Sequence, residues 1–147
     1  MNILAIDPAT KCGWAVSNQI YGCWDLSVRR DESNGMKLLR LRALLEKTHN
    51  ELDLQLVVYE RPAGLHANSI IHQAKLIAII ETFCEERNIQ YRAYSASEIK
   101  KFATGKGNAK KEQMILFAKE KLDYSGDNDN EADALWLLNL VKKDLNI

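Results

Sequence analysis

Three acidic residues stand where the surrounding sequence is apolar, and together they could hold metal ions. Asp7 ends the apolar run ILAID, Glu60 ends LQLVVYE, and Asp133 lies inside NEADALWLLNL. Carboxylates gathered in a medium of low dielectric constant repel one another, so they need protons or a cation between them. Oxygen ligands without a histidine or cysteine cluster favour Mg²⁺ or Mn²⁺. Two such ions about 4 Å apart are the standard apparatus for phosphodiester hydrolysis.

Each acid also has a purely structural interpretation. Asp7 precedes a proline, which is typical of a turn, and the polar run just before Asp133 is typical of a helix cap. Helical geometry places Asp129 and Asn130 on the same face as Asp133, which follows them by four and three residues. Glu131 points roughly 160° away and is expected to cap the helix. Capping explains that polar run well but Asp133 poorly, because an acid within an apolar run is costly to bury without partners.

A lysine-rich stretch could hold the phosphate backbone of a nucleic acid. Residues 98–111 contain five lysines and one acid, whereas acids dominate residues 120–133. Lys106 lies in the loop GKG, and Lys110 and Lys111 open the next predicted helix, a setting that suits phosphate. A solvated basic face is the alternative. The formal net charge of zero argues only weakly against nucleic-acid binding, because the local distribution of charge matters more than its sum.

The elements that must position these residues follow from the hydrophobic pattern. It predicts strands over 2–7, 13–17 and 20–28, a helix over 33–50, a strand over 54–60, a helix over 68–87, a strand over 90–94, and helices over 95–103, 109–121 and 130–145. Ser95 with Glu98 three residues on forms a capping box.

The order of these elements predicts an α/β fold. Strands that alternate with helices pair in parallel, whereas the first three strands form an antiparallel meander. We therefore expect a mixed β-sheet, with antiparallel hairpin strands plus parallel strands, flanked by helices on both faces. If the strands of Asp7 and Glu60 are parallel neighbours, both acids share the sheet edge at which such folds bind ligands.

Length and composition fit a single domain over residues 1–147. Hydrophobic residues make up 46% and charged residues 27% of the chain, which is the composition of a globular protein. No apolar run approaches the roughly 18–20 residues of a membrane span, and we expect neither a secretion signal nor a membrane partner. Cys12, Cys23 and Cys84 show no CxxC spacing, so no disulfide framework or zinc site is expected. Reduced thiols in the cytoplasm are the expectation.

Four segments, taken in order, resemble the motifs of RuvC-type Holliday junction resolvases. They are NILAIDPATKCGWAV, LVVYERPAG, SASEIKKFATGKGNAKKEQM and NEADALWL, and the resemblance covers nearly the whole chain. It implies an RNase H-like fold of the retroviral integrase superfamily and a homodimer that nicks two opposing strands of a four-way DNA junction. It also implies Mg²⁺ or Mn²⁺ as the cofactor, with two ions per active site, and 5′-phosphate ends. The small size suggests a phage or viral member, acting in the host cytoplasm.

The resemblance also assigns roles to individual residues. The catalytic acids that bind the metal ions match Asp7, Glu60 and Asp133, with Asp7 between both ions. Lys100 and Lys111 fall where lysines of the family contact DNA near the scissile phosphate.

The chain departs from the family pattern at two places. Family members often carry a fourth acid three residues before the last one, and here that position is Asn130. An amide oxygen can bind a metal ion but brings no charge, so either Asn130 or Asp129 supplies the fourth ligand. Bacterial relatives carry an aromatic residue shortly after the second acid, whereas ERPAGLHANS offers only the imidazole of His66. The resemblance therefore does not imply sequence-selective cutting or a strict preference for four-way junctions.

Other interpretations stay open beside the resolvase. A nuclease with the same fold and metals could act on flaps, forks and other branches, since no local motif fixes the substrate. A catalytically silent RNase H-like module that only binds DNA is disfavoured, because unused carboxylates at one edge would cost stability. For the dimer, the helix over 68–87 has isoleucines on more than one side and is the candidate interface, although core packing explains them equally well.

Overall fold

A five-stranded mixed sheet forms the centre of the computed structural model, which describes residues 1–64 and 66–147. The strands are β1 (Ile3–Asp7), β2 (Lys11–Ala15), β3 (Tyr21–Asp25), β4 (Leu56–Glu60) and β5 (Gln90–Tyr94). Their order across the sheet is β3-β2-β1-β4-β5. The pairs β1–β2 and β2–β3 are antiparallel, whereas β1–β4 and β4–β5 are parallel. The predicted mixed sheet is confirmed.

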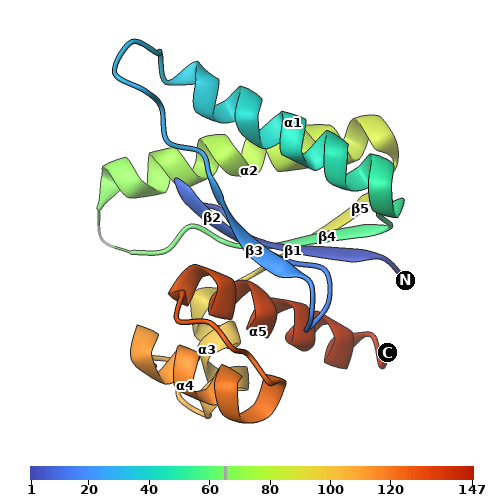
Figure 1. Ribbon diagram of the computed structural model, residues 1–147, viewed down its shortest axis with the longest axis vertical. Coiled ribbons are helices and arrows are strands. Elements are labelled where there is room, and N and C mark those ends of the chain that lie inside the picture. The colour runs from blue at the N-terminus through green and yellow to red at the C-terminus, as the bar shows by residue number, and fades with distance from the viewer. Residues whose placement is uncertain (65) are drawn as a thin grey trace.

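Helices cover both faces of this sheet (Figure 1). One face carries α1 (Gly35–Leu52) and α2 (Ala67–Arg87), and the other carries α5 (Asp129–Asp144), with α3 (Ala96–Thr104) and α4 (Lys111–Leu122) packed against α5. The capping box predicted for α3 is present, because Ser95 and Glu98 each accept a hydrogen bond from the other's backbone N–H.

Within the described part of the chain, no helix combines the length and apolar character needed to cross a membrane.

Alternation along the central strands divides the apolar side chains into two cores. Ile3 and Ala5 of β1 pack into the core under α5, whereas Leu4 and Ile6 pack into the core under α1 and α2. In β4, Leu56 and Val58 belong to the first core and Val57 and Tyr59 to the second. Side chains in a strand point alternately to opposite faces. The acids that follow Ile6 and Tyr59 are therefore directed to the α5 side.

The largest difference from the predicted elements lies in the first hairpin. Strand β2 begins at Lys11, two residues before the predicted start, and β3 ends at Asp25. Lys11 pairs with Asp25 in the register, and their side chains form an ion pair at 2.7 Å. Because this contact joins residues far apart in the sequence, the local hydrophobic pattern does not reveal it.

Candidate active site

Asp7 and Glu60 lie at the carboxyl ends of two adjacent parallel strands. The register pairs Ile6 of β1 with Tyr59 of β4, so the acid that follows each lies at the same edge of the sheet. Asp7 is only 8% exposed and is the only buried carboxylate among the described residues. The sequence prediction that these two acids share an edge is confirmed.

The third acid, Asp133, comes from α5, whose first turn lies on β2. Gly13 of β2 is the register partner of Asp7, and a Cβ atom at Gly13 would overlap the main-chain carbonyl of Asn130. The glycine thus allows the beginning of α5 to lie close against the strand next to β1. Glycine within a strand can mark such a close approach of backbone, and this signal was available in the segment KCGWA.

A hydrogen-bond network fixes the loop that leads into α5. The N-cap is Asn128, whose side chain accepts from the N–H of Glu131 at 3.0 Å. The Tyr124 hydroxyl accepts from the N–H of Asn128 at 2.9 Å and lies 2.8 Å from Glu131 Oε1, to which it donates. The expectation that Glu131 caps the helix is therefore wrong: its carboxylate binds Tyr124 instead. The sequence gives no sign of Tyr124, because its partners are set by the path of the loop.

Burial raises the pKa of all three acids, and neighbouring carboxylates raise those of Asp7 and Asp133 further. Burial, then the charges of Glu60, Asp133 and Asp129, raises the pKa of Asp7 well above its ordinary value. Burial also raises the pKa of Glu60. For Asp133, burial followed by the charges of Glu60 and Asp129 raises the pKa to about 7. Among the residues that the structure describes, none donates a hydrogen bond that would stabilise the ionised form of Asp7, Glu60 or Asp133. At all three acids the effects that raise the pKa outweigh those that lower it.

Lysines approach the same carboxylates from α3 and α4. Lys100 lowers the pKa of both Glu60 and Asp133 against the effect of burial, and Lys111 does so for Asp7 and Asp133. A pocket of about 500 Å³ is lined by Glu60 and Asp133 together with Lys100, Lys110 and Lys111.

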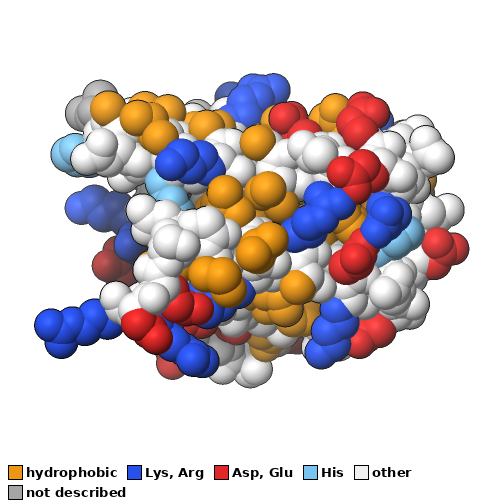
Figure 2. All heavy atoms as spheres, turned by 90° about the horizontal axis from the view of Figure 1, so that it is seen from above, with side chains coloured by type: hydrophobic (Ala, Val, Ile, Leu, Met, Phe, Trp, Pro, Cys, Tyr) orange, Lys and Arg blue, Asp and Glu red, His pale blue; other side chains and the backbone are white. Residues whose placement is uncertain are grey.

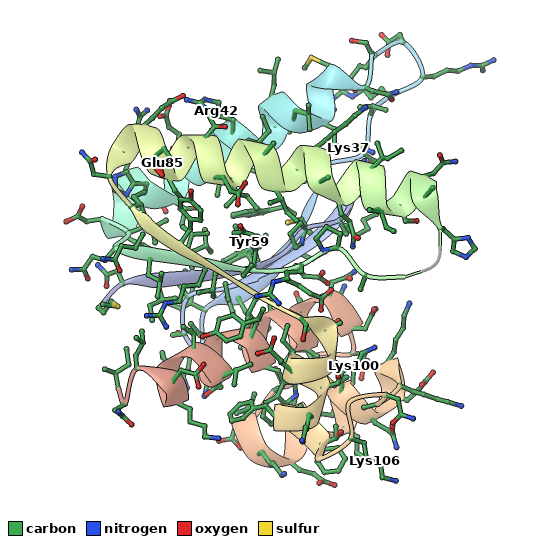
Figure 3. All side chains as sticks on the ribbon, turned by 180° about the vertical axis from the view of Figure 1, so that it is seen from behind. Lys37, Arg42, Tyr59, Glu85, Lys100 and Lys106 are labelled. Atoms are coloured by element: carbon green, nitrogen blue, oxygen red, sulfur yellow. The ribbon has the colours of Figure 1, made fainter. Side chains whose placement is uncertain are left out.

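Lys106 lies apart from these lysines. It is not among the residues that line the pocket, and Figure 3 shows it farther from the sheet than Lys100. The three lysines of the pocket, rather than the glycine-flanked loop, are therefore the positive groups nearest to the acids.

Asp129 and Asn130 differ in their surroundings. Asp129 contributes to the raised pKa of both Asp7 and Asp133, and its carboxylate lies 3.6 Å from the Lys111 ammonium. Asn130 packs its backbone and Cβ toward Gly13. Both therefore lie at the same end of α5 as Asp133, and the charge of Asp129 acts directly on the acids.

The chemistry of the site suits a hard divalent cation. Its potential ligands are carboxylate and amide oxygens, which Mg²⁺ and Mn²⁺ prefer. Among residues 1–64 and 66–147, no three His, Cys, Asp or Glu side chains converge as a preformed set of metal ligands. The acids are near enough to raise one another's pKa, so rotation of side chains would be needed to direct them at one ion.

Comparison with known proteins identifies one family. The family model described as crossover junction endodeoxyribonuclease RuvC matches residues 3–138. The chain is 28% identical over 138 residues to the RuvC protein of Helicobacter pylori, covering 86% of this chain and 85% of that protein. The structure of Thermus thermophilus RuvC has a TM-score of 0.74 at 16% identity, covering 99% of this chain and 97% of that one.

A second Thermus thermophilus structure, RuvC in complex with a Holliday junction substrate, has a TM-score of 0.73 at 19% identity. It covers 94% of this chain and 90% of that chain. These structural matches establish the RNase H-like fold of RuvC. Because the family model spans nearly all of the sequence, from Ile3 to Leu138, the chain belongs to the RuvC family of crossover junction endodeoxyribonucleases.

Proposed function

We propose that this protein is a metal-dependent endodeoxyribonuclease that resolves four-way DNA junctions. One observation carries the proposal: acids from β1, β4 and α5 gather at one sheet edge, and lysines from α3 and α4 line the adjoining pocket. Family membership supports it, and a relative of the same fold has been solved with a Holliday junction substrate. In this function the chain acts as a single RNase H-like domain.

Asp7, Glu60 and Asp133 would hold the divalent cations, Mg²⁺ or Mn²⁺, in an arrangement of two ions per site. When bound, such ions neutralise charge on the scissile phosphate and activate the attacking water. Of the two candidates for the fourth ligand, the charge interactions favour Asp129 over Asn130.

The lysines would bind the DNA backbone around the scissile phosphate. The side chain of Lys111 is 78% exposed, and its ammonium is only loosely paired with Asp129, at 3.6 Å. Exposed ion pairs of this kind contribute little to stability. A DNA phosphate can therefore replace Asp129 as the partner of Lys111 at a small cost in free energy. Asp129 is then free to bind a cation. Lys100 and Lys110 complete the positive wall of the pocket, and hydrolysis would leave 5′-phosphate ends.

The proposed enzyme acts as a homodimer, because a four-way junction has approximate twofold symmetry and needs two equivalent cuts. An apolar stripe on α2 is the candidate interface, consisting of Ala67, Ile70, Ile71, Ala74 and Ala78, all of which are exposed. Figure 2 shows hydrophobic side chains across the face that α1 and α2 cover. An exposed apolar patch rimmed by polar and charged groups is typical of a protein interface.

A broader debranching nuclease is the second candidate. The segment after Glu60 contains no Phe, Tyr or Trp up to residue 82, so no aromatic wedge is available there to open base pairs. Cutting of flaps and forks would use the same acids and lysines and would differ only in the substrate.

The test is cleavage of a labelled synthetic four-way junction in Mg²⁺ or Mn²⁺, with flap, fork and linear duplexes of matched sequence. Asp7→Asn removes one charge from the acidic cluster and is expected to abolish cleavage. Asp53→Asn is the matched control: Asp53 is exposed at the opposite sheet edge, and its left-handed conformation (φ 51°) suits asparagine.

Paired symmetric nicks on the junction, lost in Asp7→Asn and kept in Asp53→Asn, would establish a resolvase. Comparable cutting of flaps and forks would establish the debranching nuclease. Tight junction binding with no cleavage in either metal would contradict both and leave a DNA-binding module.

A further inference from the structure

A second basic pocket lies between the first turns of α1 and α2, on the face of the sheet opposite α5. Its volume is about 570 Å³, and Lys37, His72 and Lys75 line it together with Gly35 and Asn68 at the beginnings of the two helices. These residues come from elements that the acids and lysines of the proposed active site do not use. The pocket is therefore a separate feature of the molecule.

Hydrogen bonds tie this pocket to the strand that carries Asp7. Lys37 Nζ donates to the hydroxyl of Thr10 at 3.2 Å, and that hydroxyl lies 3.2 Å from His72 Nε2. Burial lowers the pKa of His72, and the charges of Lys37 and Lys75 lower it further. Thr10 follows Asp7 by three residues in the β1–β2 turn. The pocket is thus anchored at the same sheet edge as the acids.

The positive charge of the pocket is not compensated. Arg40 and Arg42 of α1 form ion pairs with Glu32 and Glu86. By contrast, no acidic side chain of the described residues pairs with Lys37 or Lys75.

The N-termini of α1 and α2 add to the positive potential of this pocket. Neither α1 nor α2 has an acid in its first turn or a side chain that caps it. In α1 the N–H groups of Met36 and Lys37 donate to the carbonyls of Ser33 and Asn34. The N–H groups of a helix N-terminus that stay unpaired favour an anion, and here they add to the charge of Lys37 and Lys75 at the pocket.

We propose that this pocket binds a backbone phosphate of the branched DNA, so that lysines on both faces of the sheet flank the phosphodiester at Asp7. Lys100 approaches the edge from the α3 side, and Lys37 approaches it from the layer of α1 and α2 (Figure 3). The inference rests on the proposed function and extends it: the DNA is held on both sides of the cut. The apolar side chain of Leu38 also lines the pocket and suits a deoxyribose next to the phosphate.

The test is the salt dependence of junction binding. All proteins carry Asp7→Asn, so that binding can be measured in Mg²⁺ without cleavage. Lys37→Gln/Lys75→Gln is compared with Lys47→Gln/Lys142→Gln, which removes the same charge at the far ends of α1 and α5. Each phosphate neutralised by a lysine contributes about 0.9 to the slope of log K against log salt. Because the pocket holds one phosphate, we expect the slope to fall by roughly 0.9 per bound protomer in the pocket variant and to change little in the control.

A second experiment replaces single phosphates of the junction with neutral linkages, in order to locate the phosphate that the pocket binds. Junctions with a single methylphosphonate are expected to bind the parent protein more weakly when the neutral linkage replaces the phosphate held in the pocket. The pocket variant should bind this modified junction as tightly as it binds the unmodified junction. Thermal melting of both variants checks that the fold is retained.

The outcomes separate the inference from the proposed function. If the Asp7→Asn parent does not bind junctions, the proposed function is wrong. If the parent binds and the pocket variant keeps the same slope, the pocket is not a DNA site and the inference is overturned. It is also overturned if inorganic phosphate stabilises the parent but not the pocket variant while the slopes stay equal, which would indicate a small-anion site. An altered oligomeric state with an unchanged slope would instead assign the pocket to a protein interface.

Discussion

Asp7 is the residue at which stability and the proposed function conflict most directly. Its carboxylate is buried and surrounded by like charge, and no residue in the described part of the chain gives it a hydrogen bond that would favour the ionised form. A structural role in the Asp–Pro turn would not need a buried position beside two other acids. The arrangement is costly for the fold alone, and a cation ligand accounts for it.

The acidic cluster makes stability depend on pH in a defined direction. A carboxyl whose pKa is higher in the folded than in the unfolded protein binds protons more tightly when folded, so folding is favoured at low pH. This contribution is lost as pH rises from the ordinary value near 4 through the folded pKa, about 7 for Asp133. In EDTA we expect the melting temperature to fall between pH 5 and pH 8, by about 2–4 °C for each kcal/mol lost.

Two controls belong to this measurement. Asp7→Asn should melt higher than the parent at pH 8 and show a flatter pH profile, because one repelling charge is gone. Mg²⁺ or Mn²⁺ should raise the melting temperature of the parent at pH 8 more than that of Asp7→Asn. A parent protein that becomes more stable from pH 5 to pH 8 in EDTA would contradict the described electrostatics.

Gly13 is expected to be essential because of its position, not because of its flexibility. In Gly13→Ala the new methyl group would overlap the Asn130 carbonyl, so α5 must shift away from β2. Overpacking of this kind costs about 1–3 kcal/mol, and the displacement of Asp133 should lower the cleavage rate at least tenfold. Urea denaturation and junction cleavage measure the two effects. Gly35→Ala, which introduces a methyl group with no atom within 4 Å, is the control for stability and should unfold like the parent.

Among the elements, α5 does most to assemble the site, because it carries Asp129, Asn130 and Asp133 and contacts four strands. Its first turn is set by Gly13 below and by Tyr124 beside it, and Gly126 packs against the Tyr124 ring. The opposite end of α5 is held by Tyr94, whose hydroxyl donates to Asp144 at 2.9 Å. The helix is therefore fixed at both ends by tyrosine hydroxyls, of which only one adjoins the acids.

Tyr124→Phe should slow cleavage without weakening DNA binding. The substitution leaves the Asn128 N–H and the Glu131 carboxylate without their partner, at a cost of about 1–3 kcal/mol. The loop before α5 then loosens, and Asp129 and Asp133 lose their fixed positions. Single-turnover cleavage and junction affinity separate the two effects. Tyr94→Phe is the matched control; an equal loss of rate in both variants would mean that helix stability alone matters.

Most of the elements could be predicted from the sequence because their cause is local. The apolar runs of β1 and β4, the strand β5 and the capping box of α3 all follow from neighbouring residues. The shared edge of Asp7 and Glu60 follows from parallel pairing of two strands that each end in an acid. What the sequence could not predict depends on how strands pair and on the path of loops, which the hydrophobic pattern does not specify. Examples are the pairing of Lys11 with Asp25 in the first hairpin and the Tyr124 network that replaces the expected Glu131 cap.

At the scale of the whole molecule, the sheet joins the two cores into one unit. Strand β1 gives Ile3 and Ala5 to the core under α5, and Leu4 and Ile6 to the core under α1 and α2. Because β1 contributes side chains to both cores, loss of packing in one core would also disturb the other. We expect a single unfolding transition in urea, with tryptophan fluorescence and far-UV circular dichroism giving the same midpoint. Two separate midpoints would contradict the assignment of one domain.

The zero net charge of the chain conceals a strong separation of charge. Lysines lie on both sides of the acidic edge, in the pocket with Lys100 and in the pocket with Lys37. Charged side chains are absent from the α2 stripe of alanines and isoleucines, which stays exposed in the isolated chain. The same molecule therefore presents one surface suited to nucleic acid and another suited to a second copy of itself.

The stripe gives the prediction that tests the dimer. Ala78→Glu introduces a charge on the exposed face of α2, beyond the lysine pocket, in a residue type that favours helices. A buried unpaired charge at an interface costs several kcal/mol, so the variant should sediment as a monomer at concentrations where the parent is a dimer. Ala43→Glu, on the exposed face of α1, should leave the dimer intact. On a four-way junction the monomeric variant should cut the two strands independently, because no second active site is held at the equivalent strand. Paired nicks from a protein that stays monomeric under assay conditions would show that the symmetry of the cut does not depend on this interface.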